Sequence, residues 1–189
     1  NPTLEDREMF CEIHYMETTI VPDGIQKGYP TEINFALLNS RIIQMKDELL
    51  NIINRKTKSY YYDFALRVCN EIGQRKASNP MTIMGRYNTF KPGYYSSRGL
   101  DIISSVLSDL FLYTNVLTSD LAYPKSQIDY LLEVLVPETA LRLISQDRGN
   151  IELEDARKIM EDSSSFEVKN IAYSYSDLPN IKNLKLLKD

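Results

Sequence analysis

The segment from Gln127 to Gln146 constrains the fold more than any other part of the sequence. Its apolar residues fall on nearly every side of a helix: Leu131, Leu132, Val134, Leu135, Val136, Leu141, Leu143 and Ile144. A helix that is apolar all round is buried at the centre of a protein. Pro137 has no N–H for the preceding turn, so it must kink this helix or begin a second one. The sequence therefore predicts a buried central helix.

Four further segments show the spacing of amphipathic helices. A first helix is expected from about Thr3 to before Pro22, with three residues turned inward: Phe10, Ile13 and Met16. Residues 38–53 and 100–117 each carry an apolar face at helical spacing. Residues 59–77 place apolar residues at intervals of four: Tyr60, Phe64, Val68 and Ile72. Residues 151–162 form a short acidic helix.

The remaining segments are predicted to be irregular. Pro22–Gly24 is expected to form a turn, and residues 80–93 to form a loop after Asn79–Pro80 ends the preceding helix. Residues 166–189 are expected to form a C-terminal arm, in which residues 171–175 are either a strand or an ordered extension. We therefore expect an all-α, single globular domain over residues 1–189, with about six or seven helices and an irregular arm at each end.

The cysteine content and the length of the apolar runs limit the kind of protein that this sequence can encode. Cys11 and Cys69 are the only cysteines among 189 residues, which fits a reducing compartment and implies no disulfide framework. The longest apolar run is too short for a membrane span, and no signal peptide is visible. Because the chain begins with Asn1 and not Met, we expect it to be part of a longer protein.

Charge is distributed unevenly along the chain. Residues 41–98 carry 11 Lys and Arg against 4 Asp and Glu, whereas residues 99–168 carry 5 against 13. The basic stretch includes seven candidate contact residues: Arg55, Lys56, Lys58, Arg75, Lys76, Lys91 and Arg98. Basic side chains next to aromatic ones, such as Tyr60–Tyr62, suit a nucleic-acid surface, since charge meets phosphate and rings stack on bases. The alternative is a solvated helix end with the tyrosines in the core.

The segment from Gly93 to Gly99 allows two interpretations. A glycine-flanked loop before a helix can hold an anion at the helix N-terminus. However, the segment is neither a Walker loop nor a dinucleotide fingerprint. We favour the second interpretation, in which the glycines serve the backbone geometry and Tyr94 and Tyr95 pack at the start of the helix.

Cys11 and His14 lie three residues apart and therefore share a face of the first predicted helix. A zinc site needs about four ligands, and Cys69 is the only other obvious one. A Cys–His nucleophile would need an orienting group and an oxyanion site. We therefore expect both residues to pack in the core, and we expect no metal site, no cofactor and no enzymatic activity.

The order of several short motifs resembles the restriction-of-telomere-capping family, the fungal family founded on the fourth protein of that name. The resemblance covers residues 10 to about 165. Its motifs are Phe10-Cys-x-x-His14, Pro22-Asp-Gly24, Gly28-Tyr-Pro30, Ile33-Asn-Phe35, Arg41, Gly93-Tyr-Tyr-x-x-Arg-Gly99, Val134-Leu-Val-Pro-Glu138, Leu143-Ile144, Asp147, Ala156 and Ser163. The chain departs from the pattern at Asn34, at Ser96-Ser97 and at Gln146-Asp-Arg148.

The resemblance implies a helical domain at the C-terminal end of a nuclear and cytoplasmic protein, with a role in telomere capping or chromatin. We therefore expect a non-enzymatic interaction domain whose basic region meets DNA, histones or a chromatin-bound protein, with no contact to membranes. The alternative is a protein–protein or self-association module without direct nucleic-acid contact, in which the basic and acidic regions pair.

Overall fold

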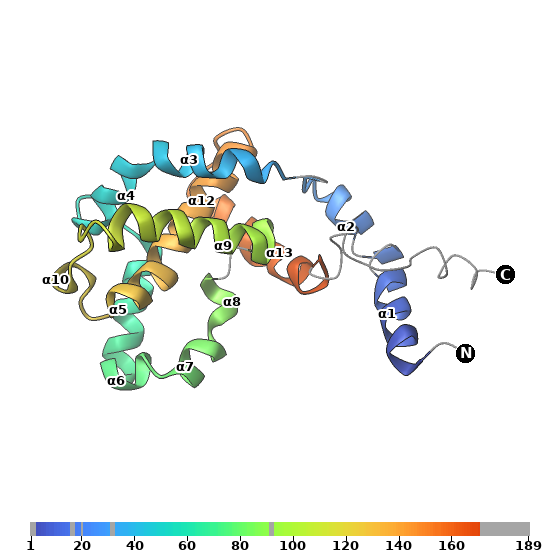
Figure 1. Cartoon of the computed structure of the whole chain (residues 1–189), viewed down its shortest axis with the longest axis horizontal. Coiled ribbons are helices and arrows are strands. Elements are labelled where there is room, and N and C mark those ends of the chain that lie inside the picture. The colour runs from blue at the N-terminus through green and yellow to red at the C-terminus, as the bar shows by residue number, and fades with distance from the viewer. Residues whose placement is uncertain (1–2, 16–17, 20, 31–32, 91–92, 171–189) are drawn as a thin grey trace.

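The chain folds into helices packed around a central helix (Figure 1). The computed structural model describes residues 3–15, 18–19, 21–30, 33–90 and 93–170. Within these ranges every regular element is helical and no strand occurs, which confirms the all-α prediction. No helix in the same ranges combines the length and the apolar character needed to cross a bilayer.

The helical elements are short, and several continue directly into the next. In chain order they are α1 (Leu4–Tyr15), α2 (Val21–Gln26), η2 (Phe35–Leu37), α3 (Leu38–Gln44), α4 (Lys46–Ile53), α5 (Tyr60–Ile72), α6 (Gln74–Ala77), α7 (Pro80–Gly85), α8 (Tyr87–Phe90), η3 (Gly93–Tyr95), α9 (Ser96–Leu107), η4 (Ser108–Leu112), α10 (Ser119–Ala122), α11 (Gln127–Tyr130), η5 (Leu131–Leu135), α12 (Val136–Asp147) and α13 (Leu153–Asn170). The described residues thus contain more α-helical segments than the six or seven predicted, because turns and wide helical stretches divide the longer ones.

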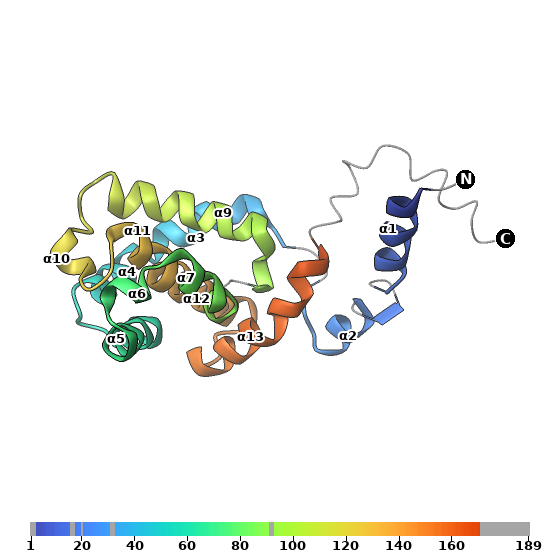
Figure 2. The same cartoon turned by 90° about the horizontal axis from the view of Figure 1, so that it is seen from below.

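The predicted central helix is confirmed as the continuous run of α11, η5 and α12. Every residue from Val134 to Ile144 except the polar ones belongs to the buried apolar core, and the polar ones are buried as well. Helices α3 and α9 pack against each other and cross one side of this run, while α5 and α13 lie on the other (Figures 1 and 2). The hydrophobic effect therefore acts on all faces of the run from Val134 to Ile144. Earlier in the run Leu132, which was predicted to be buried, is exposed.

A π-helical stretch leads the central helix into Pro137. The stretch η5 ends two residues before this proline, and α12 accepts Pro137 within its first turn. A proline ring in a helix interior clashes with the carbonyl four residues earlier, and the wider π turn removes that clash. The helical run thus continues through Pro137 and remains buried on both sides of it.

The same π stretch carries a buried carboxylate, Glu133. Lys125 donates to both of its oxygens at 2.8 and 3.0 Å, and Arg86 donates to one of them at 3.0 Å. All three side chains are almost completely buried. A buried charge is tolerated only when it is paired, so this cluster fixes the end of α7 and the segment before α11 against η5.

The buried stripe of α5 differs from the prediction. Tyr60 and Ile72 are exposed, and the buried residues of this helix are the next ones along: Tyr61, Ala65 and Cys69. Both sets have a spacing of four, and the prediction favoured the set with the larger side chains. The helix also ends earlier than expected, because Gly73 follows it with a left-handed φ of +83°.

Two segments predicted to be irregular are helical. Pro22–Gly24 lies inside α2, where Pro22 occupies the first turn and needs no N–H partner. Residues 80–93 contain α7, α8 and the start of η3. Asn79 starts α7 as its N-cap, accepting a hydrogen bond from the Met81 N–H at 2.9 Å, with Pro80 next. The Asn–Pro pair therefore starts a helix as well as following one.

The N-terminal helices α1 and α2 lie beyond one end of the helical body in both views (Figures 1 and 2). Arg148 joins this region to the body by donating to the carbonyls of Gly28 and Lys27, and the ring of Tyr29 meets Tyr94 edge to face. Cys11 and His14 are exposed on α1, so the prediction that they pack in the core is wrong. The Ile13 side chain and Met16 lie outside the described structure.

At the other end, α13 continues to Asn170. The predicted C-terminal arm therefore begins as helix. Residues 171–189, including the segment predicted to be a strand or an ordered extension, lie outside the described residues.

Three polar side chains, Arg41, Tyr95 and Asp147, form a cluster at the C-terminal end of α12 that we call the clasp. Arg41 pairs with Asp147 at 2.7 Å and donates to the Leu143 carbonyl at 3.1 Å. The Tyr95 hydroxyl donates to the other Asp147 oxygen at 2.6 Å. A guanidinium suits the negative end of a helix, where carbonyls lack partners. The clasp thus joins α3, η3 and α12.

Gly99 allows the close approach of Tyr95, the tyrosine of this clasp. A Cβ at Gly99 would lie 2.3 Å from the Cβ of Tyr95, whereas a Cβ at Gly85 would meet nothing within 4 Å. Gly99→Ala is therefore expected to lower the free energy of unfolding by about 1–3 kcal/mol through overpacking. Gly85→Ala should leave it unchanged or raise it by less than about 1 kcal/mol. Urea unfolding of both variants checks this, and equal effects would contradict the proposed close approach.

Two buried tyrosines are expected to respond oppositely to loss of the hydroxyl. Tyr95→Phe removes the bond to Asp147 and should destabilise the protein by about 1–3 kcal/mol, because the acceptor is a charged group. The buried Tyr61 hydroxyl has no hydrogen-bond partner among the described groups. Tyr61→Phe should therefore be neutral or stabilising by about 1 kcal/mol. The measurement is the urea midpoint, and a loss for Tyr61→Phe as large as that for Tyr95→Phe would refute this difference.

Candidate functional site

A groove of about 490 Å³ lies between α5, α12 and the start of α13. Its lining mixes aromatic, aliphatic and charged side chains: Lys58, Tyr60, Asp63, Phe64, Arg67, Glu138, Leu141, Leu153, Glu154 and Arg157. A concave surface with apolar walls and a few placed charges is the usual form of a binding site.

One wall of the groove is a strip of aromatic rings flanked by guanidinium groups. Tyr60 and Phe64 stack with ring centroids 6.4 Å apart and planes inclined by 17°. Arg157 lies over the Tyr60 ring at 4.6 Å, and Arg67 lies 5.4 Å from the centre of the Phe64 ring. The strip offers flat apolar area next to positive charge, a combination enriched at protein interfaces.

The charges around the groove differ in how far they are neutralised. Arg157 is held between Glu154 and Glu161, and these carboxylates keep its pKa above the usual range. Arg67 is exposed and makes no ion pair within the described part of the chain. Lys58 is 90% exposed and lies 4.0 Å from Asp63, a distance at which an exposed pair contributes little. Lys58 and Arg67 are therefore the positive charges available to a ligand.

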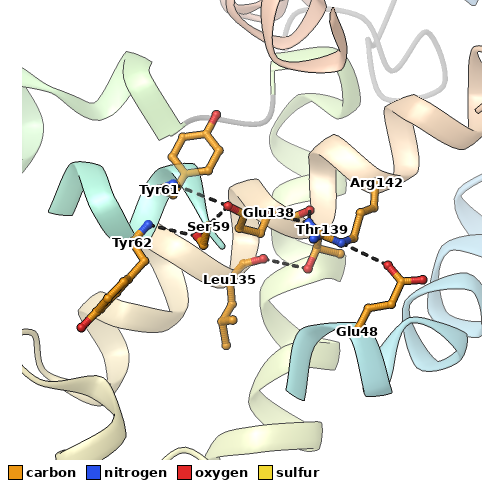
Figure 3. A network of polar contacts seen from close by, with 8 residues as sticks. All are labelled: Glu48, Ser59, Tyr61, Tyr62, Leu135, Glu138, Thr139 and Arg142. Atoms are coloured by element: carbon orange, nitrogen blue, oxygen red, sulfur yellow. Dashed lines mark hydrogen bonds and ion pairs between the residues drawn. The ribbon is translucent and has the colours of Figure 1, made fainter. Parts of the chain in front are cut away.

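The floor of the groove reaches a buried polar network centred on Glu138 (Figure 3). One carboxylate oxygen accepts from the Ser59 hydroxyl at 2.6 Å and lies 3.5 Å from the Tyr61 amide nitrogen. The other accepts from Arg142 at 2.7 Å, and Arg142 also donates to Glu48 at 3.2 Å. The network thus connects α4, α5 and α12.

This network fixes the first turn of α5. Ser59 is the N-cap of α5, and its oxygen accepts from the Tyr62 N–H at 3.1 Å. The carboxylate of Glu138 then adds a full negative charge at the positive end of the same helix. A residue of α12, remote in sequence but in contact with Ser59, therefore sets where α5 begins. It thereby also sets the position of the Tyr60–Phe64 strip.

Among the predicted contact residues, Arg55 has an internal role. Its guanidinium donates to the Tyr130 hydroxyl at 2.8 Å and to the Leu121 carbonyl at 2.5 Å, and it lies 3.6 Å from the centre of the Tyr62 ring. Its donors are thus used within the fold, where they hold the α4–α5 connection against α10 and α11.

The other predicted residues are spread over the surface. Lys56 and Lys58 are exposed before α5, and Arg75 and Lys76 are exposed after it. Arg98 is exposed and lies 4.8 Å from the centre of the Phe35 ring. Lys91 lies outside the described residues. The structure therefore separates two pairs of cations at opposite ends of α5.

Sequence reasoning missed Arg67 and assigned the aromatic strip to the core. Tyr60, Phe64 and Arg67 lie at positions i, i+4 and i+7 of α5, which places them on one face. That spacing was visible in the sequence. It indicated a common face without showing whether the face points inward or toward solvent.

The segment from Gly93 to Gly99 contributes to the packing of the core. Tyr94 and Tyr95 are buried, as is Gly99, and η3 packs closely against α13. This agrees with the favoured interpretation of the segment.

No group of three or more His, Cys, Asp and Glu side chains within the described ranges is arranged to hold a metal. Cys69 is buried in α5, far along the chain from Cys11 and His14 on α1. Burial raises the pKa of the Cys69 thiol.

Comparison with known proteins gives one match. The sequence model of the family described as RTC4-like domain matches residues 54–167, more than half of the chain. This confirms the family predicted from the short motifs. No curated protein and no solved structure matches the chain. The matched region contains the whole lining of the groove.

Removal of Glu138 tests the network at the groove floor. Glu138→Ala leaves the buried Arg142 with Glu48 as its only carboxylate partner and removes the acceptor of Ser59. It is expected to lower the free energy of unfolding by about 3 kcal/mol, the low end for a broken buried pair. Glu48→Ala is the control, since the Glu48 side chain is 66% exposed, and should cost less than about 1 kcal/mol. Similar losses in guanidinium unfolding would contradict a special role for Glu138.

Proposed function

This chain belongs to the RTC4-like domain family, which is linked to restriction of telomere capping, and we propose that it acts as a non-enzymatic interaction domain on chromatin. The partner is a protein segment that carries acidic and apolar side chains. It binds in the groove between α5, α12 and α13. The observation that carries the proposal is the Tyr60–Phe64 strip with Lys58 and Arg67 beside it.

The groove favours a protein segment because it offers apolar area and charge of both signs. An apolar side chain would bury the ring faces and Leu153, which the free chain leaves partly exposed. Acidic side chains would meet Lys58 and Arg67, whereas Asp63 and Glu154 would repel a continuous row of phosphates. A histone surface or a chromatin-bound protein supplies such acidic segments.

A second candidate is direct contact with DNA. Lys56 and Lys58 precede α5, and Arg75 and Lys76 follow it. A helix of 13 residues is about 20 Å long, so the two pairs are far enough apart to reach separate phosphates of a duplex. This contact would use both ends of α5 and not the aromatic strip.

Two charge reversals of equal size separate these candidates. Lys58→Glu with Arg67→Glu changes the groove, and Arg75→Glu with Lys76→Glu changes the far end of α5. We expect the groove pair to weaken binding to nucleosomes by about tenfold, and the far pair to have less than a twofold effect. Binding to nucleosomes and to matched free DNA is measured over a salt series.

Each outcome of this experiment is informative. Equal losses from both pairs, with equal affinity for free DNA and a shallower salt dependence, would favour direct DNA contact. Wild-type affinity in the folded groove variant, or no nucleosome binding at low salt, would refute docking to chromatin through the groove.

A further inference from the structure

The available positive charges of the groove lie at its two ends along α5, and the aromatic rings lie between them. Lys58 precedes the N-cap of α5, and Arg67 follows Tyr60 and Phe64 on one face of this helix. From the N-cap to Arg67 the helix rises by about 12 Å. A ligand that meets both cations therefore needs two negative groups at this separation, with apolar area between them.

The carboxylates of the groove disfavour a negative group in its middle. Asp63 lies between the two cations along α5, and its side chain is 52% exposed. Glu154 lies on the opposite wall, where it and Glu161 pair with Arg157 and leave a net negative charge. A carboxylate placed between these walls would meet like charge, which weakens binding. The groove thus favours a negative charge at each end and an uncharged side chain in the middle.

The separation of the two cations favours an extended ligand over a helical one. An extended chain rises by about 3.3 Å per residue, so about five residues span the distance. A helix needs about nine residues for the same span, and a helix that short is not stable by itself in water. Because ordering each residue on binding costs entropy, the extended segment requires the smaller loss.

We propose that the groove binds a linear protein segment in extended conformation, in which two acidic residues lie four positions apart with an apolar residue midway. The acidic residues meet Lys58 and Arg67, and the apolar side chain covers the rings of Tyr60 and Phe64. The two intervening side chains point away from the groove, because side chains alternate along an extended chain. This inference rests on the proposed function and specifies the partner of the same surface.

The test is binding of the full chain to two fluorescent peptides of identical composition, measured by anisotropy. One peptide carries the order Asp-Ser-Leu-Ser-Asp between glycine–serine flanks, and its isomer carries Ser-Asp-Leu-Asp-Ser. In the isomer, an extended chain that places Leu on the rings turns both acids away from the groove. We expect the isomer to bind about fivefold more weakly at the same salt concentration.

A charge exchange identifies the contact at Arg67. Arg67→Glu should weaken binding of the first peptide by about tenfold. Two further peptides carry Lys in place of one or the other terminal Asp. One of them should regain most of the lost affinity for the variant, because opposite charges then meet again. Arg75→Glu, an equal charge change beyond the end of α5, is the control and should alter each affinity by less than about twofold.

The outcomes separate this inference from the proposed function. Equal affinity of the two isomers, or no recovery with either Lys peptide, would overturn the extended motif. Nucleosome binding through the groove without binding of any peptide would also overturn it and leave the proposed function intact. Selective peptide binding without nucleosome binding would support the motif and refute docking to chromatin.

Discussion

The buried ion pair between Glu138 and Arg142 is the interaction on which the rest of the structure depends. Glu138 lies within the central helix, yet its carboxylate accepts from the N-cap residue of α5, and Arg142 extends the network to α4. Loss of either member of this buried pair would leave the other charge buried without its main partner. The pair therefore fixes α5 against α12, and these two helices form two sides of the groove. The surface proposed to bind chromatin is thus set by the interior of the protein.

Most residues that carry the family resemblance have a structural role. Arg41, Tyr95 and Asp147 form the clasp at the end of α12, and Gly99 allows Tyr95 to approach closely. Pro137 and Glu138 belong to the buried central run. These motifs maintain a scaffold, which agrees with a family signature that contains no recognisable catalytic arrangement. Arg67, which belongs to the proposed binding surface, lies outside these motifs.

Other motif residues are exposed, among them Cys11 and His14, which lie on the surface of α1, before the region that matches the family model. The groove, by contrast, lies within that region and has Lys58 and Arg67 beside the Tyr60–Phe64 strip. A contact made through these exposed charges would be sensitive to salt.

The sequence by itself determined the all-helical class and the buried central helix, because an apolar run with residues on every side of a helix has one stable environment. It also determined the family and the packing role of Tyr94 and Tyr95. The tertiary structure decided which face of α5 is buried, because Tyr60–Phe64 and Tyr61–Ala65–Cys69 have the same spacing. It decided that Arg55 is used internally, since its partners Leu121 and Tyr130 are distant in the chain. It also decided where Glu138 acts, because a helix cap supplied by another helix leaves no local pattern in the sequence.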